Sequence, residues 1–204
     1  MSDQPERPSG GWPSDPPGNR ARLNDEDRGT LREIALDCIR QGLKTGRSLD
    51  LDRSRYSPSL QEPGACFVTL ELGGRLRGCV GSIEARRSLV EGVVLNAFAA
   101  AFRDYRFPPL SEEELPKIEF HISRLTPVEL MEVENREDLL RSLEPGVDGL
   151  LMEDPPHRST FLPQVWQSLK RPEDFLRELL RKAGLPPDHW SPTISFYRYR
   201  VEEF

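Results

Sequence analysis

Residues 65–81 read ACFVTLELGGRLRGCVG, and this stretch decides the fold class of the chain. Every second residue from Cys66 to Leu72 is apolar, which is the period of a half-buried β-strand. The pair Gly73-Gly74 is a turn signal, and Arg75–Gly81 then alternates small or apolar side chains with a more polar set. The stretch therefore predicts an antiparallel β-hairpin.

The length of the turn decides which side chains face each other across this hairpin. A two-residue loop would place Leu72 opposite Arg75 and would mix the polar and apolar faces. A three-residue loop places Leu70 opposite Leu76 and pairs apolar with apolar residues, so we predict that register. In this register Cys79 lies on the polar face of the second strand.

Helical patterns flank the hairpin on both sides. Asn24 is the predicted N-cap of the first helix, whose apolar stripe recurs at helical spacing: Leu31, Ile34, Ala35, Cys38 and Ile39. Ser88 and Glu91 form a capping box, and the apolar stripe of the helix that it begins runs from Leu89 to Ala101. Thr45–Gly64 has no clear period and is predicted to be a long loop.

The C-terminal half continues with strands and helices that do not alternate one for one. We predict a strand at Ile118–Ile122, a helix from Asn135 to Leu143, a strand at Val147–Met152, a helix from Pro172 to Ala183 and a strand at Thr193–Val201. The alternation of apolar and polar residues in the last strand shifts by one position between Phe196 and Tyr197, which predicts a bulge. Hairpins and separate helices favour an α+β fold with a mainly antiparallel sheet over a doubly wound parallel sheet.

Composition limits the classes of partner. The chain has 204 residues, a net charge of −6 and a pI of about 5.3, which argues against non-specific nucleic-acid binding and against docking on anionic membranes. No apolar run approaches the ~20 residues of a membrane helix. The length is ample for a hydrophobic core.

The first 22 residues differ in composition from the rest. They are rich in Pro, Gly, Ser, Asp and Arg, and Trp12 is their only large apolar side chain. Such a segment buries too little surface to offset its ordering entropy. We predict that residues 1–22 form a flexible tail without a secretory signal, and that residues 23–204 form the folded domain.

The three cysteines indicate a reducing compartment. Cys38 and Cys66 belong to apolar patterns, whereas Cys79 lies on a polar strand face, and an odd number spread in this way is typical of free thiols. We therefore expect a cytoplasmic protein.

The segment from Leu76 to Gly81 is the best candidate for a functional site. Gly78 and Gly81 let the backbone approach a neighbour or a ligand closely on either side of Cys79, and the charge of Arg77 favours a thiolate. Cys79 is then a nucleophile, a redox thiol or a ligand contact. The structural alternative is a packed strand residue between glycines that the curvature of the sheet requires.

Other chemical patterns are weaker. His121 points away from the core by strand parity and would form a thiol–imidazole pair with Cys79 if their strands were neighbours; otherwise it is a solvated strand residue. His157 and His189 show no ligand spacing with the cysteines, so no metal site is predicted. The glycine spacing of Gly73–Gly78 lacks the lysine of a phosphate-binding loop.

Leu76-Arg77-Gly78-Cys79-Val80-Gly81 resembles the Leu-Arg-Gly-Cys-Ile-Gly signature of the AmmeMemoRadiSam system protein A family, also called the AMMECR domain family. Asp104–Leu110 is similar to that family's Asp-Pro-Arg-Phe-Pro-Pro-Leu, with Tyr105 in place of proline. Further matches follow in the same order: Glu112–Ser123, Gly149–Leu151, Phe161–Val165 and Lys182–Leu185. The resemblance spans about Leu23 to Phe204.

This resemblance implies a larger and a smaller lobe with a cleft between them. It also implies an association with a Memo-like protein and a radical S-adenosylmethionine protein, but it identifies neither a reaction nor a cofactor. Two hypotheses follow. In the first, a cleft around Arg77, Cys79 and Arg106 binds a small ligand or performs chemistry, with Arg106 anchoring an anion unless it merely caps the preceding helix. In the second, the same surface is a non-catalytic module that binds protein partners.

Overall fold

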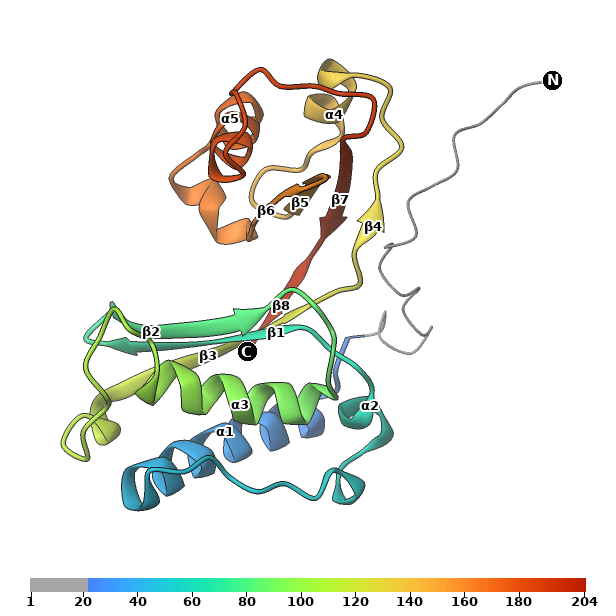
Figure 1. Ribbon diagram of the computed structural model, residues 1–204. Helices are drawn as coiled ribbons and strands as arrows, with labels where there is room; N and C mark the ends of the chain where they lie inside the picture. The colour runs from blue at the N-terminus through green and yellow to red at the C-terminus, as the bar shows by residue number, and fades with distance from the viewer. Residues whose placement is uncertain (1–21) are drawn as a thin grey trace.

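The computed structural model describes residues 22–204, which form two lobes, each built on a four-stranded antiparallel sheet (Figure 1). The predicted tail, residues 1–22, lies outside the described residues except for Arg22, which is exposed. The predicted α+β class with antiparallel sheets is confirmed. The helices and strands are α1 (Asp25–Thr45), η2 (Arg53–Arg55), α2 (Pro58–Gln61), β1 (Cys66–Leu72), β2 (Arg75–Ser82), α3 (Leu89–Phe102), η3 (Leu115–Lys117), β3 (Ile118–Leu125), β4 (Glu129–Leu130), α4 (Arg136–Ser142), β5 (Gly149–Asp154), β6 (His157–Phe161), η4 (Pro163–Gln167), α5 (Pro172–Lys182), β7 (Ser195–Tyr199) and β8 (Val201–Glu203).

The larger lobe has the strand order β2-β1-β3-β8, with α1 and α3 covering one face of the sheet (Figure 1). Asn24 and Ser88 cap these two helices as predicted, and the Ser88–Glu91 capping box is complete. The apolar stripes of both helices pack against alternate residues of β1, including Val68 and Leu70, to form the core of the lobe. The other face of the sheet is turned towards the smaller lobe.

The predicted register of the β1–β2 hairpin is wrong. The turn contains only Gly73 and Gly74, both with positive φ, and Leu72 lies opposite Arg75. A register shift follows at once, because Glu71 pairs with Leu76 while Leu70 pairs with Gly78. This β-bulge inserts one extra residue into β2, and it restores the apolar face from Gly78 onward.

The smaller lobe has the strand order β4-β7-β5-β6. Its core gathers apolar residues of α4, α5, β5 and β7, and the ring of Trp166 in η4 stacks on Phe175 of α5 at 3.8 Å between centroids. Strand β6, with the sequence HRSTF, lacks an apolar period and was not predicted. Its position is stabilised by a tertiary contact, because the Ser159 hydroxyl of β6 donates a hydrogen bond to the Leu179 carbonyl of α5.

The smaller lobe is inserted between β3 and β8 of the larger lobe, so the chain crosses twice between the lobes. The two crossings run side by side: Thr126 N–H donates to the Arg200 carbonyl, and Arg200 N–H donates to the Thr126 hydroxyl, both at 2.8 Å. The segment predicted as one strand at Thr193–Val201 is therefore two strands in different sheets, β7 and β8, divided at Arg200.

A third apolar cluster joins the lobes at these crossings. It contains Leu125 of β3 together with Leu151 and Tyr199 of the smaller lobe.

The predicted bulge between Phe196 and Tyr197 is wrong, because β7 pairs with β5 without a break. Phe196 lies in the core of the smaller lobe and Tyr199 in the inter-lobe cluster, so both faces of β7 are buried. A strand that is buried on both faces does not keep one regular alternation of apolar residues, and this explains the shift at Phe196 and Tyr197.

Within residues 22–204 no helix has the length and apolar character needed to cross a membrane.

Candidate functional site

The backbone of Cys79 is held by two charged side chains from the loop after α3. Strand β2 is at the edge of its sheet, so its outward N–H and C=O groups have no neighbouring strand. Asp104 accepts a hydrogen bond from the Cys79 N–H at 2.9 Å, and the Arg106 guanidinium donates to the Cys79 carbonyl at 3.2 Å. Together these side chains occupy the place of a missing strand partner.

Asp104 and Arg106 also bind each other. Arg106 Nη2 lies 2.6 Å from Asp104 Oδ2, and the Asp104 side chain is only 4% exposed. Hydrogen bonds from Arg106, and then from the backbone of Cys79, outweigh the effect of burial and hold the pKa of the Asp104 carboxyl well below its usual range. The Asp104 carboxyl is therefore a charged structural group at neutral pH.

Arg77, at the β-bulge, is committed to another ion pair. Its side chain is buried, and Nε and Nη2 donate to the two carboxylate oxygens of Glu114 at 2.8 and 3.0 Å. The hydrogen bonds from Arg77 lower the pKa of Glu114 to about 2. Arg77 and Arg106, both expected to contact a ligand, thus each have a carboxylate partner inside the protein.

The two glycines of the segment allow close packing. A Cβ atom at Gly78 would lie 2.1 Å from the carbonyl oxygen of Ala100 in α3. A Cβ atom at Gly81 would lie 2.3 Å from the ring of Phe67 and 2.5 Å from the carbonyl oxygen of Cys66. All three distances are far below van der Waals contact, so glycine at these positions is required by the fold itself.

Cys79 and His121 lie in one row across the sheet but do not form a pair. Thr69 of β1 lies opposite Cys79 on one side and opposite His121 on the other. Two strand spacings, about 10 Å in total, therefore separate the two residues. The Thr69 hydroxyl donates to the Cys79 sulfur at 3.3 Å, and His121 Nδ1 lies 3.8 Å from a carboxylate oxygen of Glu203. Cys79 and His121 would form a thiol–imidazole pair only if β2 and β3 were neighbours, and β1 lies between these two strands.

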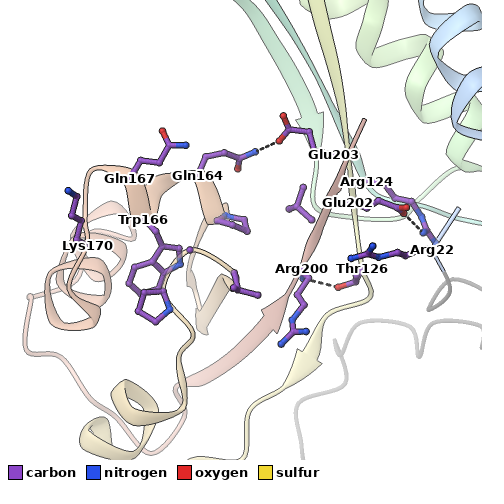
Figure 2. Close-up of a pocket in the computed structure, with 15 residues that line it drawn as sticks. Arg22, Arg124, Thr126, Gln164, Trp166, Gln167, Lys170, Arg200, Glu202 and Glu203 are labelled. Atoms are coloured by element: carbon purple, nitrogen blue, oxygen red, sulfur yellow. Dashed lines mark hydrogen bonds and ion pairs between the residues drawn. The ribbon is translucent and has the colours of Figure 1, made fainter. Parts of the chain in front are cut away.

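A cavity of about 810 Å³ lies between the lobes, beside β8 (Figure 2). The larger lobe contributes Arg124 of β3 and the residues of β8 to its wall. The smaller lobe contributes the segment Pro145–Val147 and, around η4, Gln164, Gln167 and Lys170. The crossing residues Thr126 and Arg200 also line it, so the cavity lies where the two lobes are connected.

Part of the charge in this cavity belongs to a buried network. Glu202 accepts from Arg28 of α1 at 2.6 Å and from Arg124 at 3.0 Å, and it also accepts the N–H of Leu23. Burial would raise the pKa of Glu202, but the hydrogen bonds from Arg28 and Arg124 outweigh it, so the pKa is lowered. This network fixes the start of α1 to β8.

Three other cations line the cavity with exposed side chains: Arg22, Lys170 and Arg200. Arg200 lies 3.1 Å from Glu144 and 3.9 Å from the buried Asp148. The side chains of Arg200 and Glu144 are more than half exposed, and such exposed pairs contribute little to stability. Glu203 is the exposed anion of the wall. The exposed lining therefore carries more positive than negative charge, although the protein as a whole is acidic.

None of the six residues predicted for the site lines this cavity: Arg77, Gly78, Cys79, Gly81, Arg106 and His121. The first five gather around the outer edge of β2, and His121 lies two strands away. The cationic residues of the cavity are far apart in sequence and belong to no local motif, so no pattern in the sequence pointed to them. Of the six, His121 approaches the cavity, because its Nδ1 lies 3.8 Å from the carboxylate of Glu203, which lines the cavity.

The chain resembles known proteins over most of its length. It matches the family model described as AMMECR1 over residues 32–204. A protein of Methanothermobacter thermautotrophicus is 38% identical over 190 residues, which cover 90% of this chain and 96% of that protein. A protein of Methanocaldococcus jannaschii is 37% identical over 191 residues, covering 90% of this chain and 92% of that one.

A solved structure agrees with these matches. The crystal structure of an uncharacterised protein from Pyrococcus horikoshii has a TM-score of 0.78 and 34% sequence identity, covering 89% of this chain and 92% of that one. The fold, the ordered motifs around Cys79 and the family model all lead to one assignment, which the resemblance in sequence had predicted. The chain belongs to the AMMECR1 family.

Proposed function

We propose that the chain is a binding protein that takes an anionic ligand into the cavity between its lobes, and that the segment Leu76–Gly81 mainly supports the fold. The observation that carries this proposal is the cavity of about 810 Å³, lined from both lobes, with Arg22, Lys170 and Arg200 exposed in its wall. Ligand sites in proteins are typically concave, of this size and placed at the boundary between two lobes or domains.

The surroundings of the signature segment support the second half of the proposal. Arg77 and Arg106 are each held in a short ion pair with Glu114 and Asp104, whose side chains are only 24% and 4% exposed, so an anion would have to displace a carboxylate that is part of the fold. Lys170, in contrast, extends from the smaller lobe into the cavity wall with its side chain exposed. An anion that binds both Lys170 and Arg200 would hold the two lobes together at their crossing.

A thermal-shift screen with a panel of mono-, di- and tricarboxylates, phosphates and nucleotides tests this proposal. We expect at least one anion to raise the melting temperature of the full chain, because a ligand that binds only the folded state stabilises it. The variant Lys170→Ala should lose most of that shift. Lys44→Ala, which removes an exposed lysine in the last turn of α1, should keep it. A panel without any hit, or equal shifts in both variants, would contradict the proposal.

A second function, protein interaction, is favoured by a different observation. Tyr105 is 95% exposed, although it lies between Asp104 and Arg106, which both bind Cys79. Leu76, at the start of the same edge, is 44% exposed. Aromatic side chains are enriched at protein interfaces, and exposed apolar patches mark interaction sites. We propose this edge as the contact with a Memo-like or a radical S-adenosylmethionine protein of the AmmeMemoRadiSam system.

Co-purification of the chain with each of these two proteins, taken from the same organism, tests the interaction. The double variant Tyr105→Ser/Leu76→Ser should abolish co-elution, while Leu95→Ser, which changes an exposed leucine of α3, should not. If neither protein co-elutes with the unaltered chain, this second function is rejected.

We also propose a cytoplasmic location, since all three thiols of the chain are free.

A further inference from the structure

Strand β8 has a free edge. It is the last strand in the order β2-β1-β3-β8, and within residues 22–204 only β3 pairs with it. Phe204 exchanges both backbone hydrogen bonds with Ile122, and Arg200 bonds to Thr126. Hydrogen-bonded residues alternate along an antiparallel pair, so the N–H and C=O groups of Val201 and Glu203 point away from β3.

The cavity between the lobes lies along this free edge. Three consecutive residues of β8 line it, from Val201 to Glu203 (Figure 2). Successive side chains of a strand point to opposite faces of the sheet. A cavity above one face would therefore contact alternate residues, whereas a cavity along the edge contacts all three. The outward backbone groups of Val201 and Glu203 thus face the cavity.

We propose that the ligand of this cavity is an extended acidic peptide segment of a partner protein, which pairs with β8 as a fifth strand of the larger-lobe sheet. The inference rests on the binding function proposed above and specifies its ligand. An unpaired strand edge is a ready template for another chain, and strand addition is a common mode of peptide recognition. The backbone groups of the edge would provide the affinity, and the side chains of the wall the selectivity.

The charges of the wall indicate an acidic peptide. Lys170 is exposed on the smaller-lobe side and Arg200 at the crossing next to β8, and the side-chain amides of Gln164 and Gln167 line the same cavity. Gln164 reaches Glu203 at 3.4 Å, an exposed contact that an incoming strand can replace. Alternate acidic side chains of the peptide would face these cations, while its backbone amides face β8.

The N-terminal segment of the chain is a poorer candidate for this edge. It joins the cavity wall at Arg22, but residues 1–21 include Pro5, Pro8, Pro13, Pro16 and Pro17. Proline has no N–H to donate to a strand ladder. A partner segment without prolines therefore fits the edge better.

The probe is an acetylated and amidated hexapeptide of alternating glutamate and threonine, titrated into the full chain. We expect saturable binding, with hydrogen exchange at the Val201 and Glu203 amides slowed in the complex. The same peptide N-methylated at every amide keeps all charges but lacks the donors, and it should bind at least about tenfold more weakly. If both peptides bind equally, or if neither binds, the inference is overturned.

Two substitutions at one position separate the backbone from the side chain. Glu203→Pro removes an outward N–H without affecting a bond to β3, since proline is tolerated on an edge strand. It should weaken binding of the hexapeptide at least about tenfold. Glu203→Gln keeps the N–H and removes a negative charge, so it should bind the acidic peptide no more weakly than the unaltered chain. Equal affinities of the two variants would contradict strand addition.

Two further outcomes identify other occupants. If deletion of residues 1–20 speeds hydrogen exchange at Val201 and Glu203, the N-terminal segment occupies the edge, and the partner-peptide inference is wrong. Glutarate, which has two carboxylates and no amide, tests the underlying function separately. If glutarate binds in a manner that depends on Lys170 while the hexapeptide does not bind, the anion site stands and strand addition falls.

Discussion

Gly78 is required because β2 and α3 approach each other without room for a side chain. A Cβ atom at this position would lie 2.1 Å from the backbone oxygen of Ala100, which cannot move without displacing α3. We predict that Gly78→Ala lowers the free energy of unfolding by about 2 kcal/mol, as expected for overpacking in a core. Gly29→Ala is the control, since nothing lies within 4 Å of a Cβ there. Denaturant unfolding of both variants measures the difference, and a neutral Gly78→Ala would contradict the close approach.

The three thiols should differ in reactivity. Cys38 and Cys66 are buried in the core of the larger lobe, and burial raises the pKa of the Cys66 thiol to about 12. Cys79 is partly exposed on the face of the sheet away from the helices. Alkylation of the native protein, followed by peptide mass spectrometry, should therefore modify Cys79 first and the other two only on unfolding. Modification of Cys66 at the same rate would contradict the buried core.

At the scale of the element, the edge of β2 depends on Asp104. The unfolded chain protonates this carboxyl near pH 4, and the folded protein only at lower pH, because Arg106 and the Cys79 N–H stabilise the charge. The charged Asp104 carboxylate therefore stabilises the folded state fully above about pH 4. This stabilisation is lost as the pH falls through the lowered pKa that the carboxyl has in the folded protein. Asp104→Asn should cost about 2 kcal/mol at pH 7 and should flatten the acid limb of the stability curve. Urea unfolding across a pH series, with the exposed Asp50→Asn as control, tests this; parallel curves for the two variants would refute it.

Most elements follow from local patterns in the sequence, and the errors occur where distant packing decides. The caps Asn24, Ser88 and Asn135 begin their helices as predicted. The register of the hairpin was wrong because matching of apolar faces cannot show a bulge, which depends on Gly78 packing against α3. The division of the last strand at Arg200 was missed because both of its halves have strand-like sequences, and only the two separate sheets distinguish them.

At the scale of the whole molecule, the two candidate regions differ in how far the sequence predicts them. Leu76–Gly81 is contiguous and distinctive, so it was identified at once, and its contacts with Asp104, Glu114 and Ala100 tie it to the fold. Catalytic or ligand-binding roles for its residues stay predictions. The cavity combines side chains from both lobes that only the folded chain brings together, so sequence periodicity and spacing carry no signal for it.

The claim that the ligand binds between the lobes, and not at the signature cysteine, is tested most directly by one pair of affinities. The dissociation constant of the strongest anion from the thermal-shift panel is measured for Lys170→Ala and for Cys79→Ser by titration calorimetry. Loss of a charge-assisted contact should weaken binding to Lys170→Ala by about tenfold or more, while Cys79→Ser should bind like the unaltered chain. Weakened binding to Cys79→Ser together with unchanged binding to Lys170→Ala would contradict the account and would place the ligand at the edge of β2.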